Sequence, residues 1–463
     1  MDKDRDRFKD FDEEERQLVL DFENTVLRGG HRFFDVDELE IIMDYYFEVN
    51  DIAPLQRAVE YAEQLYPDST TVKLRRAHLL IAKEQFDEAM RIIKELRRVE
   101  PDNTDVAYSL GVAYGAMGEH EEAVKHFLEA ATDGWMPGRV YANIAEEYYH
   151  MNNFDEAIRY YQLALDTDSY DSATLYNYID TAIQSNAAED AVTYLKSFVG
   201  EHPYSGEAWH CLGNAYRSLG LFEQAIDAYE YAIAIDKTNA AAYADHAATL
   251  EYMGRPAEAV TTLLRALDYV SSRAALYRMV AAIYMRSDNV EMALVYYRKA
   301  VDENPSDAEA LASLALAYAM SGDVSTAMPL LRKALRLAPE SAEVLYSAAV
   351  IYDSIDNFDA ASDYFERTMM SDECTEMMCQ QYVQFLYKRK VYDILAQFAD
   401  ESLEIYPHNP FYSTYLAAAY YYTNRYNRAS QVLPDVNPVL LAEICPEIMT
   451  NAHFSHLIPP VSE

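Results

Sequence analysis

A 34-residue period runs through most of this chain and constrains its fold more than any other feature. Steps of 34 residues divide the chain into twelve units with no insertion between them. The units open at Val36, Thr70, Thr104, Gly138, Ser172, Gly206, Ala240, Ala274, Ala308, Ala342, Glu376 and Pro410. Self-similarity at a fixed period of this size is typical of folds that stack one supersecondary unit many times. We therefore expect one elongated stack in which each unit contacts its neighbours.

The pattern within each unit predicts two helices joined by a short turn. In the unit that opens at Gly206, helical spacing places one set of residues on a single face: Trp209, Leu212, Gly213 and Tyr216. Gly220 ends this first helix, because glycine tolerates the left-handed conformation that a helix end needs. The second helix, from Phe222 to Ile235, carries an apolar stripe of its own.

A small residue recurs at the twentieth position of the units. It is Ala89, Ala123, Ala157, Ala191, Ala225, Ala259, Ala293, Ala327, Ala361 and Ala429, and the exceptions are Leu55 and Leu395. Two helices joined by a short turn cross closely, and only a small side chain fits at the crossing. Tyrosine is frequent at the eleventh position and proline at position 32, where it ends the second helix.

The repeated pattern resembles the tetratricopeptide repeat family. The motif is Trp/Leu-x2-Leu-Gly-x2-Tyr, followed by Ala-x3-Phe/Tyr-x2-Ala and then Pro, and it recurs over about 400 residues. Leu110-Gly111 with Tyr114, and Leu212-Gly213 with Tyr216, match it well. The resemblance implies an all-α, right-handed superhelical solenoid of about twelve helix-turn-helix repeats with capping helices at both ends. It also implies a concave groove that binds protein, and no active site.

The two ends of the chain depart from the repeat. Residues 1–35 are expected to form a charged segment and a capping helix over 11–28, with an apolar stripe of Phe11, Leu18, Phe22 and Val26. Such a helix would cover the apolar side of the first unit, which a terminal repeat requires for solubility. The solenoid is then expected over residues 36–443, and a C-terminal cap and tail over 444–463.

Prolines interrupt the last unit. Its second helix is expected to stop near Pro434, and a capping helix over 438–450 is interrupted by Pro446. Residues 451–463 read as an irregular, mobile tail. His453 and His456 in this tail have no acid or cysteine nearby to complete a metal site.

The chain carries a formal net charge of −39, which limits its partners. Binding to nucleic acid or to an anionic membrane surface draws on positive charge, so both are disfavoured. A protein or peptide partner with basic residues is allowed. The alternative is that the acidic surface only keeps a long solenoid soluble.

The charge is also uneven along the chain. Residues 1–69 hold 20 acids against 8 bases, whereas residues 70–103 hold 8 bases against 6 acids. An acidic edge beside a basic one allows weak self-association between copies of the chain.

Nothing in the sequence predicts catalysis or a cofactor. The chain contains no phosphate-binding loop, no zinc-protease motif and no nucleophile elbow. The four cysteines, Cys211, Cys374, Cys379 and Cys445, have no metal or redox spacing and are expected to be reduced and unpaired. No signal peptide or membrane-spanning run is found, so a cytoplasmic protein is expected.

The family resemblance places a ligand on the first helices, whose positions 2, 5, 6, 9, 12 and 13 point into the groove. On these positions the candidate partner-binding residues are Tyr108, Asn143, Tyr176, Asn177, Asn214 and Arg217. A row of asparagines can hydrogen-bond an extended backbone, because an amide both donates and accepts. Tyrosines add flat contact area with a polar tip. The alternative is that these residues are simply solvated.

The prediction is therefore a non-catalytic scaffold or adaptor that binds a partner segment in its concave groove, without cofactor or metal. The alternative is a structural protein that assembles with itself through charge-complementary surfaces.

Overall fold

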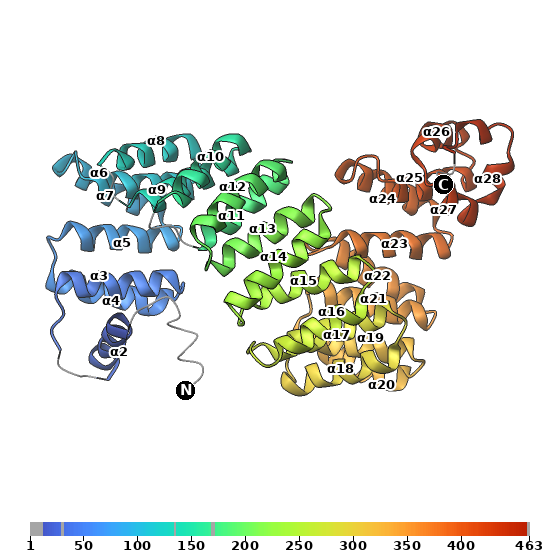
Figure 1. The fold of residues 1–463 in the computed structure, drawn as a ribbon, viewed down its shortest axis with the longest axis horizontal. Helices are drawn as coiled ribbons and strands as arrows, with labels where there is room; N and C mark the ends of the chain where they lie inside the picture. The colour runs from blue at the N-terminus through green and yellow to red at the C-terminus, as the bar shows by residue number, and fades with distance from the viewer. Residues whose placement is uncertain (1–12, 29–31, 134–135, 168–171, 461–463) are drawn as a thin grey trace. The chain divides into compact units, whose positions relative to one another are not determined.

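The computed structural model describes residues 13–28, 32–133, 136–167 and 172–460 (Figure 1). It divides into two compact units, Met1–Asp236 and Lys237–Glu463, and each is described by itself. Every regular element in the described part of the chain is helical. In that part, no helix combines the length and the apolar character needed to cross a bilayer.

Unit 1 begins with helix α2 (Glu13–Arg28), and helix pairs follow in chain order. The first helices of the pairs are α3 (Val36–Glu48), α5 (Thr70–Ala82), α7 (Thr104–Ala116), α9 (Pro137–His150), α11 (Ser172–Gln184) and α13 (Gly206–Ser218). Their second helices are α4 (Ile52–Leu65), α6 (Phe86–Val99), α8 (His120–Ala130), α10 (Phe154–Leu165), α12 (Ala188–Glu201) and α14 (Phe222–Ile235). A short 3₁₀ turn, η1 (Ala131–Asp133), follows α8.

Unit 2 continues the same alternation. Its first helices are α15 (Ala240–Tyr252), α17 (Arg273–Arg286), α19 (Ala308–Met320), α21 (Ala342–Ser354), α23 (Glu376–Lys388) and α25 (Pro410–Tyr422). The second helices are α16 (Pro256–Ala266), α18 (Val290–Glu303), α20 (Val324–Leu337), α22 (Phe358–Met369), α24 (Tyr392–Ile405) and α26 (Tyr426–Val432). Across both units, each first helix begins at the residue predicted from the period or one residue before it.

A left-handed residue ends the first helix of every pair. It is the fifteenth residue of the repeat, with φ between 50° and 88°: Asn50, Glu84, Gly118, Asn152, Asn186, Gly220, Gly254, Asp288, Gly322, Asp356, Lys390 and Asn424. After α13, the amide of Leu221 donates to the carbonyl of Tyr216 at 2.9 Å, and that of Gly220 to Arg217 at 3.0 Å. These are the two bonds of a Schellman motif, which satisfies the last carbonyls of a helix. The repeated turn therefore comes from a backbone conformation more than from one residue type.

Small residues allow the paired helices to approach each other. Ala225, the crossing alanine of its pair, is fully buried, as predicted for this position. A second close approach occurs at the eighth position, where a Cβ on Gly213 would lie 2.4 Å from a ring carbon of Tyr229. Gly111 meets the ring of Phe127 in the same way, at 2.6 Å. The aromatic ring of the second helix thus fills the space that the glycine leaves.

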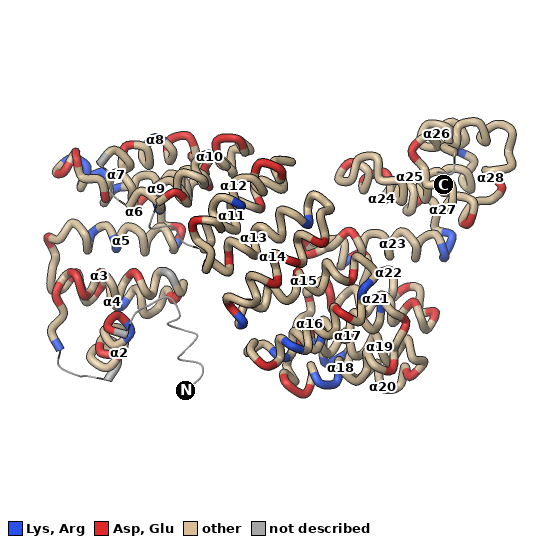
Figure 2. Tube along the Cα trace, in the orientation of Figure 1, with Lys and Arg blue, Asp and Glu red and all other residues tan. Residues whose placement is uncertain are grey.

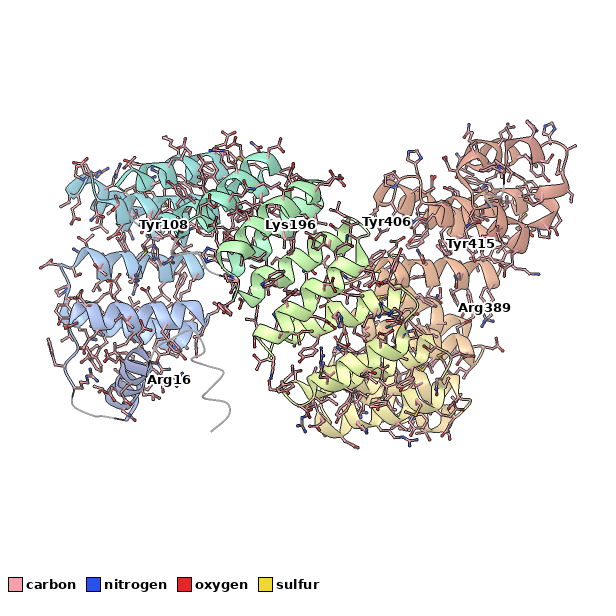
Figure 3. All side chains as sticks on the ribbon, in the orientation of Figure 1. Arg16, Tyr108, Lys196, Arg389, Tyr406 and Tyr415 are labelled. Carbon is pink, nitrogen blue, oxygen red and sulfur yellow. The ribbon has the colours of Figure 1, made fainter. Side chains whose placement is uncertain are left out.

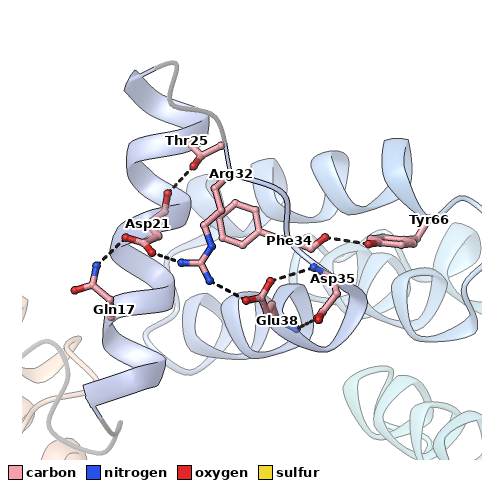
Figure 4. Close-up of polar contacts among 8 residues, drawn as sticks. All are labelled: Gln17, Asp21, Thr25, Arg32, Phe34, Asp35, Glu38 and Tyr66. Atoms are coloured by element: carbon pink, nitrogen blue, oxygen red, sulfur yellow. Dashed lines mark hydrogen bonds and ion pairs between the residues drawn. The ribbon is translucent and has the colours of Figure 1, made fainter.

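Helix α2 covers the start of the first pair, in agreement with the predicted capping role. Leu18, Val19 and Phe22 are buried in one apolar cluster with residues of α3 and α4. Arg32 forms ion pairs with Asp21 of α2 and, at 2.8 Å, with Glu38 of α3 (Figure 4). Phe11, the first residue of the predicted stripe, lies outside the described residues.

Asp35 and Glu38 also form a capping box at the start of α3. The Glu38 amide donates to Asp35 at 2.8 Å, and the Asp35 amide donates to Glu38 at 3.1 Å (Figure 4). The Tyr66 hydroxyl donates to the carbonyl of Phe34 at 3.0 Å and fixes the chain that enters α3 (Figure 4). Reciprocal caps of this kind satisfy two amides that a helix start leaves open.

At the other end, short helices follow the last pair as the prolines predict. Helix α26 stops at Val432 and is followed by η2 (Leu433–Asp435), α27 (Pro438–Ile444), α28 (Pro446–Thr450) and η3 (Ser455–Leu457). From residue 451 to residue 460 the backbone is irregular apart from η3, as predicted, but this segment is packed against the cap. Phe454 is buried in an apolar cluster with Leu441 and Ile448, so the segment up to residue 460 belongs to the cap.

Candidate functional site

The inner positions of four successive first helices line a pocket in unit 1. Its volume is about 450 Å³, and its residues come from α3, α5, α7, and α9 with the residue before it. They fall almost entirely at positions 2, 5, 6 and 9 of their repeats: Asp37, Glu40, Ile41, Asp44, Thr71, Leu74, Arg75, His78, Asp105, Tyr108, Ser109, Met136 and Arg139. We call this the α3–α9 pocket.

Arg75 lies at the centre of the charges in the α3–α9 pocket. Its Nη2 atom is 2.7 Å from Glu40 Oε1 and 2.8 Å from Asp44 Oδ2. Burial raises the pKa of both carboxyls, and the Arg75 guanidinium opposes that rise. This guanidinium therefore supplies much of the charge balance that a pair of partly desolvated acids needs.

Asp105 adds a carboxylate to the same pocket. Burial raises the pKa of this group, and Arg75 again opposes the shift. Its Oδ1 atom is buried and has no hydrogen-bond partner within the described structure. A buried acceptor without a donor costs free energy, and the Nε atom of Arg75 in the same pocket is likewise buried without a partner.

His78 lies in the wall of the pocket as a neutral ring. Its Nε2 atom is 2.9 Å from Ser109 Oγ. Burial, with smaller effects from Arg75 and Arg139, lowers the pKa of His78 to about 3. The imidazole is therefore uncharged near neutral pH and adds no cation to the pocket.

The pocket consequently contains more acid than base. Its lining holds four carboxylates, Asp37, Glu40, Asp44 and Asp105, against the guanidinium groups of Arg75 and Arg139. The Arg139 guanidinium makes a cation–π contact with the Tyr108 ring, with its central carbon 5.4 Å from the ring centre. In Figure 2 the acidic residues of α3 lie close to the few basic ones of α5.

The structure joins two of the six predicted site residues directly. The Asn143 side-chain amide donates to the Tyr108 hydroxyl at 2.8 Å, and this bond links α9 to α7. Tyr108, labelled in Figure 3, is buried and is also part of the α3–α9 pocket. The predicted row of residues and the pocket therefore meet at this tyrosine.

The next members of the row are bonded to neighbouring helices of unit 1. Asn177 of α11 donates to Glu146 Oε1 of α9 at 3.3 Å. The Tyr176 hydroxyl lies 3.3 Å from Nδ1 of His210 on α13. These bonds connect successive first helices along the inner face.

The last two predicted residues lie on α13. Asn214 Oδ1 accepts from the hydroxyl of Tyr229 at 2.8 Å, and Tyr229 is a buried residue of the second helix α14. This amide oxygen therefore contributes to packing within its own helix pair. Arg217 is exposed near the end of α13.

The site prediction from sequence did not include the acidic residues of α3 or Arg75 and His78 of α5. The unit that opens at Val36 is degenerate, with Leu55 at the crossing position, so it matches the repeat motif less well than the others. Asp37, Glu40 and Asp44 do occupy positions 2, 5 and 9 of that unit, so the same positional rule would have found them.

Comparable charged residues in unit 2 are paired within the inner face. Arg278 of α17 pairs with Glu309 of α19 and approaches Glu343 of α21 at 3.9 Å. Arg286 reaches Glu251 at 2.5 Å. In the described ranges, no group of three or more His, Cys, Asp or Glu side chains is arranged to hold a metal ion.

Comparison with known families agrees with this architecture. Models of the tetratricopeptide repeat match residues 55–110, 104–132, 138–171, 206–239, 245–308, 281–342 and 314–368. These segments together cover more than half of the chain. The protein thus belongs to the tetratricopeptide repeat family.

Individual relatives are distant. The chain is 21% identical over 307 residues to the TPR repeat-containing protein YpiA of Bacillus subtilis (strain 168), covering 58% of this chain and 72% of that one. The structure of yeast Tom70 is 12% identical, with 90% of this chain and 97% of that chain covered and a TM-score of 0.47. The Cut9 and Hcn1 assembly of the APC/C matches with 14% identity, coverage of 87% and 92%, and a TM-score of 0.39. Their likeness to this chain concerns the fold alone.

Proposed function

We propose that this protein is a non-catalytic scaffold that binds a segment of another protein on the inner face of unit 1. The α3–α9 pocket takes a lysine or arginine side chain of that segment. The Asn143, Tyr176 and Asn177 part of the face contacts the segment further along. Membership of a family of interaction repeats supports the scaffold role.

The buried Oδ1 atom of Asp105 is the observation that carries this proposal. It is an acceptor without a donor, in a pocket where carboxylates outnumber guanidinium groups. An ammonium or guanidinium group supplies both the missing donor and the missing positive charge. A carboxylate or phosphate ligand would add negative charge beside Asp37 and Glu40 and is disfavoured.

Affinity for such a segment should depend on salt. The charges of the pocket lie near the surface, so ionic strength screens their attraction for a basic partner. Electrostatic complementarity of this kind contributes to association rate and to specificity.

Selection of random displayed peptides against the full chain tests the proposal. We expect the selected peptides to contain lysine or arginine, and their affinity for the protein to fall with added salt. Asp105→Asn removes one charge and leaves the ion pairs of Arg75 in place. It should weaken binding by about 1.5–3 kcal/mol, the range for a hydrogen bond to a charged group.

Glu230→Gln is the matched control, because it removes one negative charge from an exposed position on the second helix α14. It should bind the selected peptides like the parent protein. The double variant Asn143→Ala/Asn177→Ala should lose about 0.5–1.5 kcal/mol for each ligand contact removed. Selection of peptides without basic residues, or equal affinities for Asp105→Asn and Glu230→Gln, would contradict the proposal.

Self-assembly through complementary charges is the less favoured function. Several cations of the Thr70 unit are already paired within the chain: Arg75 with Glu40 and Asp44, Arg76 with Glu63 at 3.5 Å, and Arg97 with Glu129. These pairs reduce the positive surface that a second copy would need. Light scattering on the purified protein at low salt separates the two functions, since only self-assembly predicts a mass that rises with concentration.

A further inference from the structure

Two cysteines lie in contact in unit 2. Cys374 belongs to the link between α22 and α23, and Cys379 lies in the first turns of α23. Their Sγ atoms are 3.6 Å apart, and both thiols are free. Both side chains are half-buried, whereas Cys211 and Cys445 are fully buried elsewhere in the chain.

The surroundings of this pair include another sulfur atom and a backbone carbonyl, since Cys374 Sγ lies 3.7 Å from the carbonyl oxygen of Thr375. The Met369 sulfur lies 3.9 Å from Cys374 Sγ. The hydroxyl of Tyr412, a fully buried residue of α25, has no hydrogen-bond partner in the part of the chain that is described. Tyr412 stacks on Tyr406, labelled in Figure 3, with ring centres 5.8 Å apart.

Tyr412 lies close enough to the thiols for their charges to interact. Burial raises the pKa of its phenol, and negative charge on Cys379, Glu376, Tyr406 or Cys374 raises it further. The phenol therefore remains protonated and stays a hydrogen-bond donor when one of these thiols ionises. Tyr412 belongs to the apolar cluster against which Cys379 packs, so this cluster holds a buried donor without a partner as well as one of the two thiols.

We propose that Cys374 and Cys379 form a thiol-oxidation site, which closes to an intrachain disulfide on reaction with a small-molecule disulfide. The two sulfurs are already in van der Waals contact. Closure requires the sulfurs to move from 3.6 Å to the length of about 2 Å of a disulfide bond. Cys374 belongs to a non-helical link, which can adjust to this movement.

The reaction proceeds by two exchanges. The Cys374 thiolate attacks one sulfur of the small disulfide, forms a mixed disulfide and releases one small thiolate. The Cys379 thiolate then attacks Cys374 Sγ and releases the second small thiolate. The protein loses two thiol protons and two electrons, and the small disulfide is reduced to two thiols.

The order of attack follows from the environment of each sulfur. Burial raises the pKa of both thiols, but a hydrogen bond from Cys379 favours the thiolate of Cys374. The pKa of Cys379 is raised to about 12, first by burial and then by Cys374 and Glu376. Once Cys374 is in the mixed disulfide it carries no charge, so Cys379 loses one of the groups that oppose its ionisation.

Closure ties the link to the start of α23. Cys379 already donates its amide to the Thr375 carbonyl at 3.1 Å. Glu376 accepts from Asn409, the N-cap residue of α25, at 2.8 Å. The oxidised site should therefore slow amide exchange in the first turn of α23.

The test equilibrates the full-length protein in mixtures of reduced and oxidised glutathione, blocks remaining thiols with N-ethylmaleimide and maps the products by mass spectrometry. We expect Cys374 and Cys379 to lose the label together and to appear in one disulfide-linked product. Cys211 and Cys445 should label as thiols after denaturation and serve as internal controls.

Two variants keep the test decisive. In Cys379→Ser, Cys374 should stop at the mixed disulfide with glutathione, and in Cys374→Ser the remaining thiol should react much more slowly. Circular dichroism shows whether each variant is folded. Three results would overturn the proposal: glutathione adducts on the parent protein without an internal disulfide, disulfides between chains, or both thiols unreacted in mixtures that oxidise dithiothreitol.

Discussion

Replacing Gly213 with alanine should destabilise the pair α13–α14, although alanine is the better helix former. A Cβ at this position would lie 2.4, 2.6 and 3.0 Å from three ring carbons of Tyr229, which is inside van der Waals contact. The ring cannot easily move away, because it is fully buried and its hydroxyl is bonded to Asn214 at 2.8 Å.

The expected magnitude combines three effects. Alanine in place of glycine in an unobstructed helix stabilises by about 1 kcal/mol. Overpacking of a filled site costs about 1–3 kcal/mol. Displacement of the ring also strains a hydrogen bond worth about 1 kcal/mol. We therefore expect a net loss of about 1–3 kcal/mol in the free energy of unfolding.

Gly200→Ala is the matched control. Gly200 lies near the end of α12, and a Cβ there would meet nothing within 4 Å. This change should stabilise the protein by about 0.5 kcal/mol through helix propensity alone. The same substitution thus has opposite signs at two glycines of neighbouring helices.

Hydrogen exchange followed by mass spectrometry is the suitable assay, since a repeat stack need not unfold as one cooperative unit. Peptides from α13 and α14 should exchange faster in Gly213→Ala, whereas those from α5 and α6 should not change. Urea unfolding monitored by circular dichroism gives the sign of the change in the free energy of unfolding. A Gly213→Ala protein as stable as the parent, or more stable, would refute the argument from ring contact.

Four further changes test other parts of the structure. Ala225→Leu places a large side chain at a fully buried crossing and should cost about 1–3 kcal/mol in thermal or urea unfolding; an unchanged transition would contradict the close-crossing argument. Lys390→Gly removes the steric cost of a Cβ at a left-handed position with φ 60° and should raise the free energy of unfolding by about 0.5–1 kcal/mol. A decrease would show that contacts of the lysine side chain matter more than the backbone conformation. His78 has a folded-state pKa of about 3, which is below its pKa in the unfolded chain. As the pH is lowered the unfolded chain binds the proton first, so the free energy of unfolding decreases. Between about pH 7.5 and about pH 5.5 the parent should lose about 1.4 kcal/mol more than His78→Gln in urea unfolding, and parallel pH profiles would rule this out. Removal of residues 1–35 should expose the apolar side of α3 and cause aggregation measurable by light scattering, and a truncated protein that stays monomeric would exclude the capping role.

The helix boundaries were predictable because residues that favour a particular backbone conformation recur at fixed positions of the 34-residue repeat. Glycine or asparagine at the fifteenth position predicts a left-handed turn, and alanine at the twentieth predicts a close crossing. At Glu84 and Lys390 the same conformation occurs with residues that do not favour it, so the neighbouring repeats define it there. Tertiary packing in these pairs overrides the local preference.

The side-chain partners on the inner face were not predictable in the same way. Position alone puts Asn143 and Asn177 on one face. Position does not predict that Asn143 bonds to Tyr108 and Asn177 to Glu146, because these partners depend on side-chain rotamers in the adjacent repeat. The contact between Cys374 and Cys379 depends on the path of a non-helical link, which periodicity does not describe.

The hydrogen bonds between successive first helices have a consequence for recognition. A segment that binds along this face meets polar groups that already bond one another, such as Asn143 and Tyr108, and any bond that it replaces adds little. Exchange of one hydrogen bond for another changes the enthalpy little, so the polar row would discriminate among ligands more than it would hold them. In the proposed function, a basic side chain beside Asp105 and apolar contacts would then determine the residence time. Such a surface is suited to a client that must be released and recaptured quickly.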